Sequence, residues 1–336
     1  MLVASPKEGV IRLASQPRSG PPRFYVEQGV GNMVLVRATA TGAVTAAVRC
    51  PAPKSEVAFE GIAATENRAF FIVCVKIIGQ GSKRTIAERI YRFGVTDSGR
   101  ISGYSLVPGG ALHGLQVGVI AAAPGGSRVA VSVEPAAAHG AQLLGSEKII
   151  IINARTGAST IWQPGPARPG RNTFAIAALS WVGNGRELRF LARCVHLPVK
   201  NNPRCRGTDV QLGTISAAAG GGRLTGRTLL VRQVTGFVND TAISPSGSKL
   251  LLVAVHSASA RGSASVTVTQ FSASTGRKLR VFTGNGFLYR FFNSDPTGRF
   301  LLLDVGPSAG SVNGWIDQGS LIRLKPAGSG VFYEAW

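Results

Sequence analysis

The chain has 336 residues, of which 44% are hydrophobic and 16% charged, and its mean hydropathy is +0.17. This composition excludes a generally disordered chain, which needs low hydrophobicity, and the 43 Gly and 18 Pro follow no G-X-Y period, which excludes collagen. The 37 basic and 16 acidic residues give a formal charge of +21, which predicts attraction to polyanions unless it reflects a codon bias towards Arg.

Residues 1–20 are predicted to be a linker or tail. They contain no apolar stretch long enough for the core of a signal peptide, and residues 16–23 are rich in Pro, Ser and Arg. Nowhere does the chain approach the roughly 18 consecutive apolar residues of a transmembrane helix, so no membrane span is expected. Residues 21–336 are expected to form one folded domain.

A turn signature recurs along this domain at spacings of 51 to 62 residues, and each copy is followed by an apolar run such as RVAVSV or KLLLVAV. Its turn residues are Asn67, Gly126, Gly185, Gly247 and Gly298. A second turn follows each copy, where a tight hairpin demands a positive φ that glycine tolerates. Its glycines include Gly42, Gly99, Gly157, Gly221, Gly276 and Gly319. The runs between the turns are short and alternating or wholly apolar, as in β-strands.

Each repeat is predicted to form four antiparallel strands, which we call a to d, and repeats of this length indicate an all-β propeller. Six blades are expected, and seven are the alternative if GVIRLAS adds a strand or if two blades are merged. A pair of β-sandwiches is the structural alternative. The C-terminal run GVFYEAW is expected to supply strand a of the first blade and so close the ring. The blades are expected at 21–51 with 330–336, 55–108, 112–165, 174–233, 236–284 and 287–327.

The runs SPSGSKLLL and DPTGRFLLL resemble the turn-plus-strand motif of TolB-type and WD-repeat-like propellers. The order of PPRFYV, RATATGAV, ALSWVGNGRELRF, QFSASTGRKLRV and a terminal Ala-Trp is similar to that of actinobacterial propeller proteins of unknown function. This resemblance covers roughly residues 21–336 and implies no catalytic residues. Members of that group often carry an N-terminal membrane anchor with the propeller outside, and the present chain has no such segment.

Four cysteines are present, without a C-x-x-C pair. Cys194 and Cys205 flank the segment VHLPVKNNPR, and residues that flank a hairpin loop can lie close enough for a disulfide. A Cys194–Cys205 bridge is therefore one expectation, which would imply an oxidising compartment, and free thiols are the other. Cys74, within the apolar run FFIVCVKII, is expected to be a small buried hydrophobe.

The search for catalytic chemistry gives no motif. The H-E-x-x-H and G-x-S-x-G patterns are absent, and the glycines at 220–222 are not followed by Lys-Ser/Thr, so no catalytic residue, metal or cofactor is predicted. Asp240 and Asp304 lie in apolar strand patterns and are expected to be paired structurally. If the protein is instead a hydrolase or lyase with a site at the mouth of the central channel, Asp240, His113 and His256 are the first candidates.

The order of the strands sorts the connections onto two ends of the ring. The b–c and d–a connections share one end, which we call the loop end, and the short a–b and c–d turns share the other, the turn end. We count 11 cations against 4 acids at the loop end and 11 against 5 at the turn end. The charge is therefore spread, so that sequence-specific nucleic-acid binding is not expected.

Long loops on a rigid scaffold are where binding usually resides. The sequence therefore predicts a non-catalytic, monomeric interaction or scaffold module whose loop end binds a protein or an anionic cell-envelope polymer. An extracytoplasmic location, secreted or tethered by an anchor outside this chain, is expected, with the cytoplasm as the alternative. The residues expected to bind are Arg168, Arg171, Lys200, Arg204 and Arg206.

Overall fold

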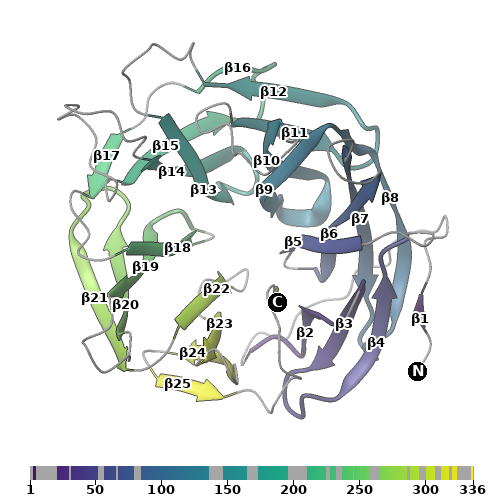
Figure 1. Ribbon diagram of the computed structural model, residues 1–336, viewed down its shortest axis with the longest axis horizontal. Coiled ribbons are helices and arrows are strands. Elements are labelled where there is room, and N and C mark those ends of the chain that lie inside the picture. Colours follow the sequence, from purple (N-terminus) through teal and green to yellow (C-terminus); the bar gives the residue numbers. More distant parts are fainter. Residues whose placement is uncertain are drawn as a thin grey trace.

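In the computed structural model, sheets follow one another in a ring, with the C-terminus inside it (Figure 1). Among the described residues the strands form six sheets and the only helical element is the 3₁₀ turn Pro124–Gly126. The described residues are 3–4, 21–29, 32–51, 57–65, 67–78, 85–135, 147–164, 173–195, 210–224, 228–231, 237–244, 246–256, 265–285, 288–294, 300–306, 312–317, 320–323 and 334–335.

Five of the sheets each contain four antiparallel strands from one stretch of chain. The second sheet along the chain contains β5 (Val57–Ala64), β6 (Ala69–Ile78), β7 (Thr85–Val95) and β8 (Ile101–His113). The third contains β9 (Leu115–Ala122), β10 (Arg128–Pro135), β11 (Lys148–Asn153) and β12 (Ser159–Gln163). The fourth contains β13 (Thr173–Val182), β14 (Glu187–Val195), β15 (Val210–Ser216) and β17 (Thr228–Val231).

In the last two of these sheets the strands also lie side by side in the order in which they follow along the chain. The fifth contains β18 (Phe237–Ile243), β19 (Lys249–His256), β20 (Ser265–Ser272) and β21 (Lys278–Asn285). The sixth contains β22 (Leu288–Ser294), β23 (Phe300–Gly306), β24 (Val312–Asp317) and β25 (Ser320–Arg323). The third sheet also carries β16 (Gly222–Arg223), which pairs in parallel with β12 at its outer edge.

The first sheet differs from these five. Its antiparallel strands of ordinary length are β2 (Phe24–Gln28), β3 (Met33–Ala38) and β4 (Val44–Arg49). At its two edges lie two-residue strands, β1 (Val3–Ala4), parallel to β4, and β26 (Glu334–Ala335), antiparallel to β2. The expectation of six, or seven, equivalent four-stranded antiparallel blades is therefore wrong. Five blades are four-stranded, and the N-terminal sheet has only three strands of ordinary length.

The predicted closing strand also needs correction. Of the run 330–336, only Glu334–Ala335 lies among the described residues, and it pairs with β2 at two positions, Val26 and Glu27. A pairing of two residues supplies far less of a hydrogen-bonded ladder than the full inner strands β5 or β9 do. Closure of the ring by a complete C-terminal strand is thus not confirmed.

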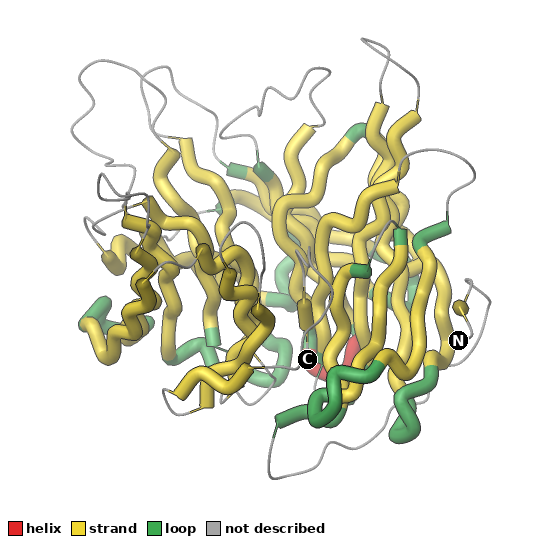
Figure 2. The backbone as a smooth tube through the Cα atoms, turned by 60° about the horizontal axis from the view of Figure 1, so that its bottom comes forward, coloured by secondary structure: helices red, strands yellow, loops and turns green. Residues whose placement is uncertain are grey.

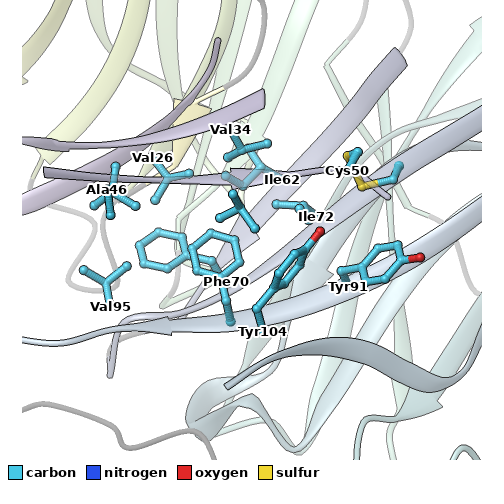
Figure 3. Close-up of a cluster of buried hydrophobic side chains, with 14 of the residues drawn as sticks. Val26, Val34, Ala46, Cys50, Ile62, Phe70, Ile72, Tyr91, Val95 and Tyr104 are labelled. Carbon is cyan, nitrogen blue, oxygen red and sulfur yellow. A yellow bond between two sulfur atoms is a disulfide. The ribbon is translucent and has the colours of Figure 1, made fainter. Parts of the chain in front are cut away.

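The core lies between neighbouring sheets and follows from the alternation of side chains along each strand. In β6, Phe70 and Ile72 pack with Val26 and Val34 of the first sheet (Figure 3), whereas the intervening Phe71 packs towards the third sheet. All of these side chains are buried, which explains why the inner strands read as continuous apolar runs.

Every fully paired inner strand carries an irregularity at a corresponding place. The ladders between the first two strands of each four-stranded sheet shift register once, opposite or beside Gly61, Val131, Ile176, Val238 and Tyr289. A β-bulge bends its strand and leaves backbone groups without a ladder partner. The inner wall of the ring is therefore bent in each blade, and the exposed backbone groups need other partners.

Gly109 and Gly157 allow the backbones of two neighbouring blades to lie close together. Gly109 in β8 has φ +69°, and a Cβ built on it would lie 2.5 Å from the carbonyl oxygen of Gly157, in the c–d turn of the next blade. Gly114 has nearly the same φ, +67°, but nothing lies within 4 Å of the corresponding Cβ position. A substitution at Gly114 therefore measures the cost of the left-handed backbone alone, and one at Gly109 measures that cost together with the cost of the close contact.

We expect Gly109→Ala to destabilise the protein more than Gly114→Ala does. Both variants carry the left-handed backbone cost of about 1–2 kcal/mol, and only Gly109→Ala also forces two backbones apart, at about 1–3 kcal/mol more. Chemical denaturation of the two variants measures the difference in the free energy of unfolding. Equal losses would contradict the close approach of Gly109 to Gly157.

Candidate functional site

The binding residues predicted from the sequence, Arg168, Arg171, Lys200, Arg204 and Arg206, all lie outside the described residues. Their grouping at one site stays a prediction. The same holds for the Cys194–Cys205 bridge, because Cys205 is outside the described residues, although Cys194 pairs with Phe174 within the fourth sheet.

The candidate residues of the enzyme alternative are spread over the ring. His113 is exposed and ends β8, the outermost strand of its sheet, where it lies opposite Ala87. Asp240 lies in the inner strand β18, and His256 ends β19. Of the helices in the described ranges, none has the length and apolar character that crossing a bilayer requires.

At the loop end of the ring, carboxylates accept hydrogen bonds from the backbone of the next blade. Glu88, fully buried at the start of β7, accepts a hydrogen bond of 2.7 Å from the backbone N–H of Val117 in the inner strand of the next blade. Glu147, one blade further on, accepts one from the N–H of Ile176. Both pairs are 29 residues apart. Leaving such a buried N–H without an acceptor would cost about 1–3 kcal/mol. At these two blade boundaries a carboxylate thus fixes the next inner strand.

Two further carboxylates at this end have a raised pKa. Burial raises the pKa of Glu27, at the end of β2, and the hydrogen bond and positive charge of Arg37 oppose that shift. Burial also raises the pKa of Glu134, near the end of β10, which lies opposite Gln116 of the inner strand. A raised carboxyl pKa makes these two groups easier to protonate than exposed carboxylates. Glu27 is only 1% exposed, however, so of the two only Glu134, at 9%, lies near the surface.

The turn end is built differently, with arginines bound to backbone carbonyls of the following blade. Arg92 in β7 donates to the carbonyl of Ala154 at 3.0 Å. Arg128, at the start of β10, donates to the carbonyls of Gly185 at 2.9 Å and Ala217 at 3.1 Å, and its guanidinium lies 5.2 Å from the ring centre of Trp181. Arg189 in β14 repeats the contact with Gly247 of the fifth sheet. Sequence reasoning counted Arg128 only as a charge of the turn end.

A disulfide joins the first two sheets. Cys50, directly after β4, is bonded to Cys74 of β6, and both are buried (Figure 3). The expectation that Cys74 is only a small buried hydrophobe is therefore wrong, because the end of β4 lies beside β6 in the ring. Tyr104 supports the same boundary, since its hydroxyl donates to the carbonyl of Arg49 at 2.8 Å. Burial raises the pKa of Tyr104, so that this donor keeps its proton.

Comparison with known proteins identifies the fold of this chain but assigns it to no family. No family model matches the chain, and no curated protein matches it. A chain of the nidogen/laminin complex is 10% identical, with a TM-score of 0.54 and coverage of 93% of this chain and 97% of that one. A putative TolB from Agrobacterium tumefaciens is 12% identical, with a TM-score of 0.50 and coverage of 91% and 90%.

The Cps50 (Swd1) β-propeller domain of Myceliophteria thermophila is also similar, at 12% identity, a TM-score of 0.47 and coverage of 94% and 86%. At such identities the comparisons describe the fold alone. The protein is a β-propeller, and the resemblance to TolB-type propellers is confirmed at the level of the fold. Membership of the actinobacterial group stays a prediction.

A peptide map without reduction is expected to contain a Cys50–Cys74 cross-linked peptide. In the chain-entropy description, closing a loop between residues 24 apart stabilises a fold by about 3 kcal/mol. We therefore expect the Cys50→Ala/Cys74→Ala variant to unfold at lower denaturant, by about that free energy. The matched control is the same comparison under reducing conditions, where neither protein has the bridge and the difference is expected to disappear. Free thiols at Cys50 and Cys74 in the oxidised protein would contradict the bridge.

Proposed function

We propose that the protein is a non-catalytic propeller module that binds a protein or an anionic cell-envelope component through its loop end. The observation that carries this proposal is the construction of that end. Glu88 and Glu147 pin the inner strands of successive blades there, so that the rim is a fixed support. The chain segments that join strands b and c are mounted on this rim, and in sequence they are longer than the turns at the other end.

The comparisons are consistent with such a role. A chain of the same fold, of which this chain covers 97%, takes part in the nidogen/laminin complex. The matched chain of that complex is only 10% identical to this one. The match therefore supports the use of this scaffold for binding but does not indicate which ligand this chain binds. Within the loop end we propose Arg168, Arg171, Lys200, Arg204 and Arg206 as the basic residues that contact an anionic partner.

We also propose an oxidising, extracytoplasmic compartment for this protein. The Cys50–Cys74 bridge supports it, because structural disulfides persist mainly in secreted and periplasmic proteins. The bridge ties two blades at a buried position, so that reducing conditions would remove a stabilising link from the fold. A peptide map without reduction, made on protein from the native host, tests this location.

The loop-end proposal is tested by charge reversal. The triple variant Lys200→Glu/Arg204→Glu/Arg206→Glu is expected to bind a delipidated cell-envelope fraction of the host at least about tenfold more weakly than the wild type, because surface charge governs encounter and retention of an anionic partner. Co-sedimentation measures the binding. The variant Arg155→Glu/Arg186→Glu/Arg277→Glu has the same charge change at the turn end and is expected to bind like the wild type. Unchanged binding by the loop-end variant would refute the proposal.

A further inference from the structure

The turn end is a rigid and repetitive surface. In each of the first five sheets, the last residue of strand c or the residue directly after it donates a backbone hydrogen bond of 2.9–3.0 Å to the carbonyl of the residue directly before strand b. The donor and acceptor pairs are Thr39 and Arg23, Val95 and Arg68, Ala154 and Ser127, Ala217 and Arg186, and Ala273 and Ser248. The short turns gather at one end of the molecule, the lower end of Figure 2. Each blade therefore presents its turns in the same fixed arrangement.

Cations occupy these turns in all five blades. Arg92, Arg128 and Arg189 are hydrogen-bonded to the next blade. The exposed cations at this end are Arg23, Arg100, Arg155, Arg186, Lys249, Arg277 and Lys278. The exposed acids among the described turn residues are Asp97 and Glu187, and Asp97 is held by Arg68 at 3.0 Å. The described turns of the first five sheets therefore carry an excess of exposed positive charge.

We propose that the turn end binds the surface of an anionic phospholipid bilayer. The cations are spread over a ring of tight turns instead of lining one groove, and a planar array of headgroups is the anionic surface that approaches all of them together. A nucleic-acid duplex would contact only a stripe of such a ring. The interaction requires no insertion, because each Lys or Arg near an anionic bilayer contributes attraction independently.

The fifth sheet provides the strongest part of this surface. Lys249, Arg277 and Lys278 are exposed there, and no acid lies in its described turns. The hydroxyl groups of the exposed Ser246, Ser248 and Ser274 lie in the same two turns, which Ala273 and Ser248 connect. Hydroxyl donors beside cations suit phosphate oxygens, which accept several hydrogen bonds.

The experiment is co-sedimentation with vesicles of phosphatidylcholine containing about 30% phosphatidylserine, in about 0.1 M salt, where the Debye length is near 10 Å. The wild type is expected to bind these vesicles, to leave vesicles of phosphatidylcholine alone unbound, and to dissociate as salt is raised. Lys249→Glu/Arg277→Glu is expected to lose at least about tenfold in binding. Arg49→Glu/Arg89→Glu, an equal charge change at exposed loop-end positions, is expected to lose much less.

Three results would overturn the proposal. They are no binding of the wild type to the anionic vesicles, equal losses in the two double variants, and tighter binding to duplex DNA than to the vesicles. Inorganic phosphate as a competitor distinguishes a bilayer from free phosphate, because only binding to isolated phosphate groups is displaced at low concentration. The loop-end variant Lys200→Glu/Arg204→Glu/Arg206→Glu is expected to keep vesicle binding, so that failure of either proposal leaves the other testable.

Discussion

Arginine side chains bound to carbonyl groups of the neighbouring blade are the contacts on which the ring depends. Among the described residues, the one backbone ladder between blades is the two-residue pairing of β16 with β12. The blades are therefore joined mainly by apolar packing, which fixes no register, and by side-chain hydrogen bonds, which do. Arg92, Arg128 and Arg189 each cross one blade boundary and end on a turn of the next blade. Hydrogen bonds to a charged donor stabilise a fold by about 1.5–3 kcal/mol, which makes these ties comparable to a disulfide.

This use of arginine changes the meaning of the charge of +21. Part of the basic excess serves the boundaries between blades at the turn end, where a carbonyl oxygen accepts the hydrogen bond and no carboxylate is needed. Of the other described turn cations, Arg68 is buried and binds Asp97, and the exposed ones carry the proposed contact with an anionic surface at the turn end. At the loop end the acids take the structural part, since Glu88 and Glu147 hold the inner strands of the following blades. Neighbouring blades are therefore joined by arginine side chains at the turn end and by glutamate side chains at the loop end.

The sequence was sufficient for the fold class, because the turn glycines and apolar runs repeat with the blade. Gly42, Gly99, Gly157 and Gly276 all have the positive φ that the hairpin pattern required. The two-residue strand β16 and the Cys50–Cys74 bridge were not predictable, since they depend on which strands become neighbours across a blade boundary. The carboxylate contacts could have been predicted from the repeat. Glu88 and Glu147 are 59 residues apart, which is the spacing of the turn residues Gly126 and Gly185.

Modification of the native protein with phenylglyoxal, followed by peptide mass spectrometry, tests the division of the arginines most directly. The reagent reaches guanidinium groups that solvent reaches. The structure predicts early modification of Arg100, Arg155, Arg186 and Arg277, which are exposed. It predicts much slower modification of Arg92, Arg128 and Arg189, which are only partly exposed and are hydrogen-bonded to the next blade. Modification of Arg128 in the native protein as fast as that of Arg155 would contradict the role of Arg128 as a tie between blades.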